Sequence, residues 1–210
     1  MSHRYDEVEV RRREPSSGLL GSPTVQTLVA FLAVFAVQSL VGLVSRGLAV
    51  GLFALAPPLS VRPWTLLVSV YAHAGVGHLV SNAVVLLLVG FAVERVTTAW
   101  RFHAFFAGVG MLAGVAQVVV TGVLSAGPVP AVLGASGAVF GLLGYLFAGN
   151  PVTDAVLRWL PVGGRARVAL LLAVAAAATL LTARPGVALV AHFTGLALGL
   201  LAGRVRLLRA

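Results

Sequence analysis

Apolar stretches separated by short polar segments make up most of the chain after residue 22. Several reach about 18 residues or more, the length at which a helix crosses a hydrocarbon core roughly 30 Å thick. We predict membrane-spanning helices over residues 24–44, 74–94, 102–123, 135–150, 167–182 and 187–203. The sequence therefore predicts an all-α membrane protein, with six transmembrane helices in one bundle over residues 23–210.

Two segments outside these spans have a different pattern. Residues 1–22 mix acidic side chains with arginine and end in a cluster of Pro, Ser and Gly, which predicts a short, mobile cytoplasmic tail. This tail does not fit a cleaved signal peptide, because the apolar run that follows is long enough to span the membrane and stay. Residues 45–63 are largely apolar but interrupted by arginine and proline, and we expect them to lie in the membrane interface.

Composition narrows the class of protein. With 59% hydrophobic and 10% charged residues, and a mean hydropathy of +1.00, the chain does not fit a water-soluble globular domain. The absence of cysteine excludes disulfide bonds, thiolate nucleophiles and thiolate metal sites. A net charge of +9 would suggest nucleic-acid binding in a soluble protein, but all 15 basic residues are arginine and most flank apolar spans. We therefore expect these charges to meet the lipid bilayer and no nucleic acid.

The arginines divide unequally between the two sides of the predicted bundle. With the N-terminus inside, six spans place twelve arginines on the inner side and three on the outer side, namely Arg46, Arg62 and Arg184. Cytoplasmic segments of membrane proteins carry such an excess. We predict a multi-pass protein of the plasma membrane with both termini in the cytoplasm.

Small residues recur at helical spacing in two of the predicted spans. The sixth carries Gly195, Gly199 and Gly203, and the fourth carries Gly137 and Gly141. Glycines four residues apart form a flat helix face that lets two backbones approach closely. Ordinary helix packing explains such a face by itself, but here it would bring polar residues of the two spans together.

Few polar side chains lie within the predicted spans, and each is costly there without a partner. They occur at the starts of the second, fourth and sixth spans: His73, His78, Ser81, Asn82, Ser136 and His192. Because these three spans all begin on the outer side, their polar residues have a similar depth, which predicts one shared site. The alternatives are helix-to-helix hydrogen bonds for His78 and Asn82 and simple packing for His192.

The chemistry expected of this site is nucleophilic catalysis. Ser136 begins a helix, where unpaired backbone N–H groups favour a developing oxyanion, and Gly134 and Gly137 permit the tight turn and close approach. A serine hydroxyl needs a base, and His192 is placed to be that base. His78 and Asn82 share a helix face, and their donors could complete an oxyanion hole with the Ser136 N–H.

Other hydrolytic chemistries lack the residues they need. The six acidic residues lie in the tail or at the inner ends of spans, which excludes paired carboxylates at depth. They are Asp6, Glu7, Glu9, Glu14, Glu94 and Asp154. The chain also lacks the His-Glu-x-x-His zinc motif. We expect neither a metal nor a cofactor.

As a set, these motifs resemble those of the rhomboid proteases. The resemblance rests on His73, His78 and Asn82, on Gly134-Ala135-Ser136-Gly137, and on Ala191-His192 followed by Gly195 and Gly199. It implies a rhomboid-like bundle and a Ser136–His192 dyad that cleaves single-pass transmembrane substrates near the outer leaflet, with His73 supporting the site. The chain departs from the family in two places. Thr65 follows Trp64 where the family often has arginine, and Phe140 stands where tyrosine often supports the histidine.

Two other functions compete with proteolysis. The first is a catalytically inactive rhomboid-like protein that binds transmembrane clients, although such a protein would be expected to have lost Ser136 or His192. The second is a small transporter or channel with a histidine proton relay, which would be expected to show midplane acids, broken helices or internal repeats. The sequence leaves open the substrate, the oligomeric state, and whether residues 45–63 or the fifth span admit substrate.

Overall fold

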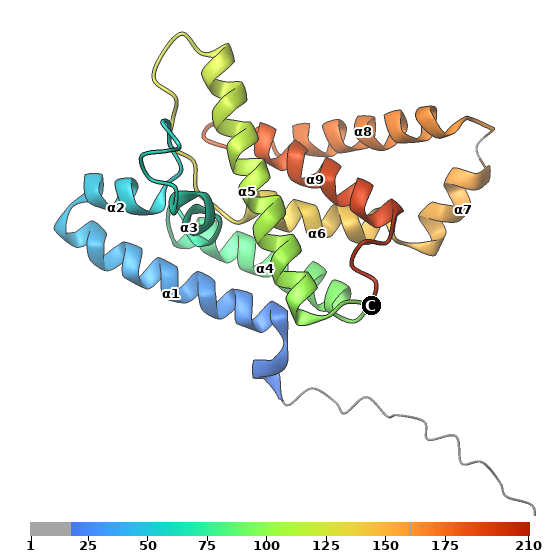
Figure 1. Ribbon diagram of the computed structural model, residues 1–210, viewed down its shortest axis with the longest axis horizontal. Coiled ribbons are helices and arrows are strands. Elements are labelled where there is room, and N and C mark those ends of the chain that lie inside the picture. Colours follow the sequence, from blue (N-terminus) through green and yellow to red (C-terminus); the bar gives the residue numbers. More distant parts are fainter. Residues whose placement is uncertain (1–17, 160) are drawn as a thin grey trace, which may run out of the picture.

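The computed structural model describes residues 18–159 and 161–210, so most of the predicted tail lies outside the described residues. Regular structure in the described part is helical (Figure 1). The elements are η1 (Leu19–Gly21), α1 (Pro23–Val44), α2 (Arg46–Phe53), α3 (Thr65–Tyr71), α4 (Val76–Glu94), α5 (Ala99–Leu124), α6 (Ser136–Ala148), α7 (Pro151–Trp159), α8 (Gly164–Leu180) and α9 (Leu189–Arg204).

Each of the six predicted spans coincides with a helix, namely α1, α4, α5, α6, α8 and α9. Within the described residues, three of these, α1, α4 and α5, are long and apolar enough to cross a membrane. The apolar helices α6 and α9 are shorter. The chain is therefore a multi-pass integral membrane protein. The short helices α2, α3 and α7 were not predicted as separate elements, because their apolar positions lie in segments broken by proline, arginine and glycine.

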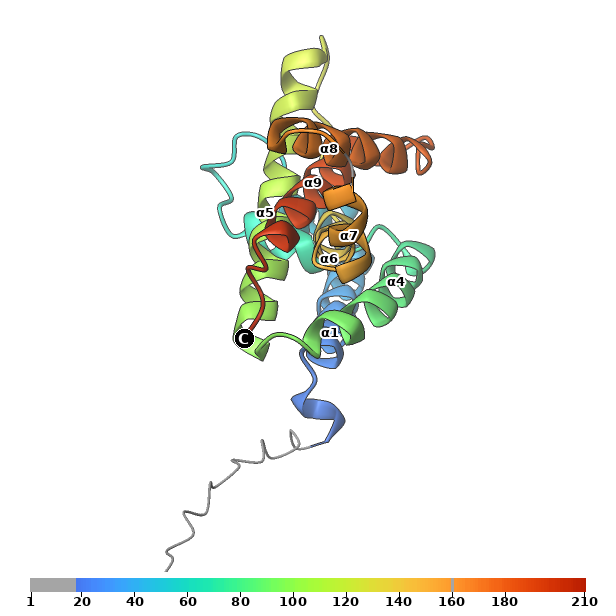
Figure 2. The ribbon, with the colours of Figure 1, turned by 90° about the vertical axis from the view of Figure 1, so that its right-hand side faces the viewer.

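Helix α6 lies at the centre of the bundle. It contacts α4, α5 and α9, and Figure 2 shows it between α5 and α4. In Figure 1, α5 runs through the middle of the molecule, with α1 and α2 on one side and α7 and α8 on the other. The interior is aromatic and aliphatic, and its fully buried side chains include Phe31, Leu86, Phe102, Phe106 and Leu142.

The closest helix contact joins α6 and α9 through their glycines. A Cβ added at Gly195 would overlap the carbonyl group of Gly137, and one added at Gly199 would overlap that of Gly141. One turn further, a Cβ at Gly203 would come within 2.6 Å of the Tyr145 carbonyl oxygen. The partners advance by four residues on both helices, so α6 and α9 run parallel in a fixed register. The two glycine faces predicted from the sequence therefore pack against each other.

A carboxylate joins the first turn of α1 to the last turn of α4. Glu94 Oε2 accepts hydrogen bonds from the Ser22 hydroxyl at 2.7 Å and from the Thr24 N–H at 3.1 Å. Ser22 is also the N-cap of α1, where its hydroxyl accepts from the Val25 N–H, and Pro23 follows at the first helical position. These residues set the start of α1 and hold it against α4.

The segment between α1 and α4 is tied down by hydrogen bonds to main-chain carbonyls. Arg62 Nη1 donates to the Gly51 oxygen at 3.1 Å and Trp64 Nε1 donates to the Leu52 oxygen at 3.2 Å. Leu55 and Val132 exchange two backbone hydrogen bonds of 2.8 Å, which connect this segment to the chain that leads into α6. Arg62 thus holds this loop from two residues before Trp64, while the position directly after Trp64 is Thr65.

Candidate active site

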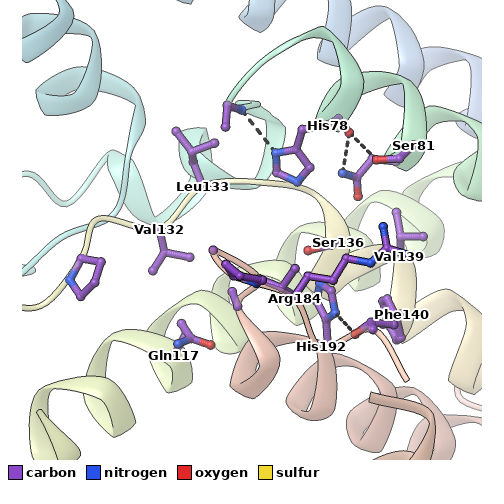
Figure 3. Close-up of a pocket in the computed structure, with 18 of the residues that line it drawn as sticks. His78, Ser81, Gln117, Val132, Leu133, Ser136, Val139, Phe140, Arg184 and His192 are labelled. Atoms are coloured by element: carbon purple, nitrogen blue, oxygen red, sulfur yellow. Dashed lines mark hydrogen bonds between the residues drawn. The ribbon is translucent and has the colours of Figure 1, made fainter. Parts of the chain in front are cut away.

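The N-terminal ends of α4, α6 and α9 open into one pocket. Its cavity measures about 780 Å³, and His78, Asn82, Ser136 and His192 all line it. Figure 3 shows His78, Ser136 and His192 arriving from different helices. Gln117 of α5 and Arg184 of the α8–α9 turn also line the pocket. The structure therefore places the predicted nucleophile, base and oxyanion donors around one space. Among the described residues that line it, none is aspartate or glutamate.

Ser136 is the first residue of α6 and is half-buried. The chain enters the helix through Gly134, whose φ of +132° disfavours residues with a side chain. The Gly134 N–H donates to the Ser69 oxygen at 2.8 Å, which holds this approach against α3. The first amides of α6 have no carbonyl partner within the helix, so the N–H groups beside Ser136 are suited to an anionic oxygen.

His78 lies against this approach. A Cβ added at Gly134 would come within 2.6 Å of His78 Cε1 and 2.9 Å of His78 Nε2. On the other side of the ring, Nδ1 accepts a hydrogen bond from the Ala74 N–H at 3.3 Å. A neutral imidazole that accepts at Nδ1 carries its proton on Nε2. The Nε2–H is thus on the side of the ring that faces the start of α6.

Asn82 and Ser81 lie one turn beyond His78 and line the same pocket. Asn82 is 5% exposed, and its Nδ2 donates to the His78 carbonyl oxygen at 2.9 Å. The Ser81 hydroxyl donates to the same oxygen at 2.9 Å. A side-chain amide has two N–H donors, so the bond to His78 uses only one of those of Asn82.

His192 lies in the first turn of α9 and is 9% exposed. Its ring stacks on Phe140 of α6, with ring centroids 4.5 Å apart and planes inclined by 16°. Its Nδ1 lies 3.0 Å from the hydroxyl oxygen of Thr182. The preceding N–H, that of Ala191, donates to Gln117 Oε1 at 3.1 Å. Phe140 of α6 and Thr182 of the turn before α9 thus hold the ring, and Gln117 of α5 holds the backbone just before it.

Backbone contact brings the Ser136 and His192 segments together. A Cβ added at Gly137 would lie 3.4 Å from the Ala191 carbonyl oxygen. The residue after the serine therefore packs against the residue before the histidine. Gly195 and Gly199 lie deeper on the same contact and keep the two helices at this separation.

His73 lies behind the pocket and does not line it. Its ring is fully buried, 4.8 Å from the Phe31 ring and 5.3 Å from the His78 ring, measured between centroids. Its backbone pairs with Gln38, whose Nε2 donates to the His73 oxygen at 2.9 Å and whose Oε1 accepts from the His73 N–H at 3.2 Å. The His73 Nδ1 atom lies 3.1 Å from the Tyr71 carbonyl oxygen. His73 thus supports the His78 ring by packing.

Three polar residues of the site were missed from the sequence. Gln38 and Gln117 lie within long apolar helices, and a polar side chain there was a sufficient signal to single them out. Thr182 gave no such signal, because a threonine at the last position of a predicted span is common. Its role is visible only when the turn before α9 folds back onto His192.

Comparisons with known proteins agree with the motifs. A family model described as the Rhomboid domain matches residues 60–209. The chain is 39% identical over 83 residues to the rhomboid protease GluP of Bacillus subtilis. This match covers 40% of this chain and 15% of that protein. It is 31% identical over 147 residues to RHOMBOID-like protein 4 of Arabidopsis thaliana, covering 70% of this chain and 34% of that one. The matches thus span well under half of the length of each relative.

Proposed function

This chain belongs to the rhomboid family, and on that premise we propose that it is an intramembrane serine endopeptidase with Ser136 as nucleophile and His192 as general base. The observation that carries the proposal is the shared pocket of the two side chains at the touching ends of α6 and α9. A hydroxyl and an imidazole that line one pocket, with unpaired helix amides next to the hydroxyl, are the groups that acyl transfer requires.

The proposed reaction has two halves. His192 Nε2 takes the proton of the Ser136 hydroxyl as Oγ attacks the carbonyl carbon of the scissile peptide bond. The resulting oxyanion accepts hydrogen bonds from the Ser136 N–H, His78 Nε2–H and Asn82 Nδ2–H. The imidazolium then gives its proton to the departing amine as the C–N bond breaks, which leaves an acyl-enzyme.

Water completes the cycle. His192 removes a proton from a water molecule as the water oxygen attacks the acyl carbon. The imidazolium then returns this proton to Ser136 Oγ as the C–Oγ bond breaks, which releases the carboxylic acid and regenerates Ser136. Every step uses side chains of the protein, and no metal or cofactor enters. Since the pocket contains no aspartate or glutamate among its described residues, the proposed unit is a dyad.

The proposal includes a place in the membrane. Helices α1, α4, α5, α6, α8 and α9 form six spans over residues 23–210, with the N-terminal tail and the C-terminus in the cytoplasm of a plasma-membrane protein. The excess of arginine on one side of the predicted bundle supports this orientation. The pocket then lies toward the outer leaflet, where water reaches it. The substrates are single-pass transmembrane proteins that enter from the bilayer.

Cleavage by purified protein tests the proposal. The full chain is reconstituted in liposomes with a single-pass model substrate and compared with Ser136→Ala, His192→Ala and the control Ser39→Ala. Ser39 is an exposed serine of α1 whose hydroxyl donates to the Phe35 oxygen, and it does not line the pocket. We expect Ser136→Ala and His192→Ala to lose at least about 10³-fold in rate while melting like the parent chain, and Ser39→Ala to cleave normally.

A fluorophosphonate probe gives a second readout that does not depend on substrate choice. Such probes form a covalent bond with an activated serine, and mass spectrometry should locate the adduct on Ser136 in the parent chain. The adduct should be absent from His192→Ala, because the base is missing. A Ser136→Ala variant that cleaves at the parent rate would falsify the mechanism. A folded chain that neither cleaves substrates nor reacts with the probe would favour client binding.

A further inference from the structure

A threonine that is absent from the recognised motifs contacts the proposed general base. Thr182 lies in the turn between α8 and α9, and its hydroxyl oxygen is 3.0 Å from His192 Nδ1. A dashed line at His192 in Figure 3 marks this hydrogen bond. It reaches the ring nitrogen that the proposed proton transfer with Ser136 does not use.

A second hydrogen bond fixes the direction of the first. The Thr182 hydroxyl is also 2.7 Å from the carbonyl oxygen of Thr179 in the last turn of α8. A carbonyl oxygen only accepts, so Thr182 must donate its single proton to Thr179. Toward His192 the same hydroxyl can then only accept. It follows that His192 Nδ1 carries a proton and that Nε2 of the neutral ring is an unprotonated acceptor.

The backbone makes this arrangement rigid. The Thr182 N–H also donates to the Thr179 oxygen, at 2.9 Å, so the turn is closed by the same carbonyl that orients the hydroxyl. Phe140, stacked at 4.5 Å, fixes the plane of the imidazole. A stacked ring can still rotate within its plane or exchange its tautomer, and the Thr182 hydrogen bond opposes both.

We propose that Thr182 is the positioning residue of the dyad: its hydroxyl, oriented by the Thr179 carbonyl, holds His192 in the Nδ1–H tautomer so that Nε2 faces Ser136. This inference rests on the proposed function. Serine hydrolases with a triad give this task to a buried carboxylate. Here a neutral hydroxyl performs it, and it also accepts the stronger hydrogen bond of the imidazolium that forms when His192 takes the serine proton.

Three substitutions separate positioning from general stability. Thr182→Val keeps the shape and removes the hydroxyl, Thr182→Ser restores a hydroxyl without the methyl group, and Thr27→Val is the matched control. Thr27 is a fully buried threonine of α1 whose hydroxyl likewise donates to a backbone carbonyl, that of Pro23, at 2.8 Å. In liposome cleavage assays we expect kcat of Thr182→Val to fall about 10- to 100-fold with KM nearly unchanged, since a hydrogen bond to a charged group is lost.

The Thr182→Ser variant distinguishes positioning of His192 from a general loss of stability. Thr182→Ser should recover kcat to within about threefold of the parent chain, and Thr27→Val should keep the parent kcat. If Thr182→Val keeps the parent kcat, or if Thr182→Ser is as impaired as Thr182→Val, the hydroxyl does not position His192 and the inference is wrong.

Nitrogen NMR measures the tautomer without a substrate. The chain is labelled with ¹⁵N in its histidine rings, and the His192 signals are those missing from His192→Gln. At neutral pH we expect a protonated Nδ1 and a bare Nε2 in the parent chain and in Thr182→Ser, and loss of this preference in Thr182→Val. A parent chain with its proton on Nε2 overturns the inference. Because this readout needs no cleavage, a failure of the proposed protease activity would be seen separately, in the substrate and probe experiments.

Discussion

The imidazole of His78 packs against the backbone of Gly134, two residues before Ser136, so closely that a methyl group at Gly134 would meet the ring at 2.6 Å. The contact joins the proposed oxyanion donor on α4 to the turn that presents the proposed nucleophile on α6. Gly134 also has a left-handed φ of +132°. Its lack of a side chain is therefore required twice, once by the backbone and once by the histidine.

Replacing Gly134 with alanine should disable the site more than it destabilises the bundle. The added Cβ strains the backbone by about 1–2 kcal/mol and displaces His78 from the approach to α6. We expect kcat to fall at least about 100-fold in the liposome assay, as for the loss of an oxyanion donor. Gly127→Ala is the control, because Gly127 lies on the same α5–α6 connection with nothing within 4 Å of an added Cβ. Equal rates for the two variants would contradict the role given to this contact.

Replacing Gly199 with alanine should separate α6 from α9. A Cβ there overlaps the Gly141 carbonyl, which is backbone and cannot move aside. We expect the melting temperature in detergent to fall by about 5–10 °C, or the variant to fail to fold, since overpacking costs typically 1–3 kcal/mol and occasionally more. Gly108→Ala in α5 adds the same methyl group where nothing lies within 4 Å, and it should melt like the parent chain.

Phe140 should tolerate tyrosine but not leucine. Its ring stacks on His192 at 4.5 Å, and an aromatic pair contributes about 0.5–1.5 kcal/mol beyond its buried area. Phe140→Leu should therefore lower kcat about 2- to 10-fold, whereas Phe140→Tyr, which keeps the ring, should stay within about twofold. Phe147→Leu, at a 59% exposed position on the same helix, measures the effect of losing a phenyl ring elsewhere. An unimpaired Phe140→Leu would show that stacking does not hold the histidine.

The link between α1 and α4 should contribute to stability without affecting the chemistry. Glu94→Gln replaces a carboxylate that accepts from both Ser22 and Thr24. We expect it to reduce stability by about 1–3 kcal/mol, measured by denaturant titration in micelles, with little change in kcat. Combining it with Ser22→Ala tests the pairing, because two residues that act through one hydrogen bond give a combined loss smaller than the sum of the single losses. Additive losses would show that the two side chains act independently.

Much of the fold could be predicted because each of the six predicted spans is a largely apolar stretch that coincides with a helix. The convergence of Ser136 and His192 on one pocket could also be predicted, since their spans start on the same side and carry matching glycine faces. Their chemical roles remain proposals. The helices α2 and α3 could not be predicted, because contacts made across the loop hold them, such as the pairing of Leu55 with Val132.

The residues that orient the site were the least predictable part. Gln38 forms hydrogen bonds with the His73 backbone, and Gln117 accepts one from the Ala191 N–H. Each glutamine lies far along the chain from its partner. Thr182 acts through a turn whose shape depends on the Thr179 carbonyl. Such roles depend on three-dimensional contacts between short polar groups, for which neither apolar periodicity nor motif spacing carries information.

The register between α6 and α9 sets a limit on how this protein can change over time. Gly137, Gly141 and Tyr145 meet Gly195, Gly199 and Gly203 one pair after another, and this contact fixes both the height and the rotation of each helix. Inserting or deleting one residue between Ser136 and Gly141 would turn the serine by about 100° and shift it by about 1.5 Å relative to His192. The short stretches from each proposed catalytic residue to its nearest glycine contact must keep their length in every working descendant.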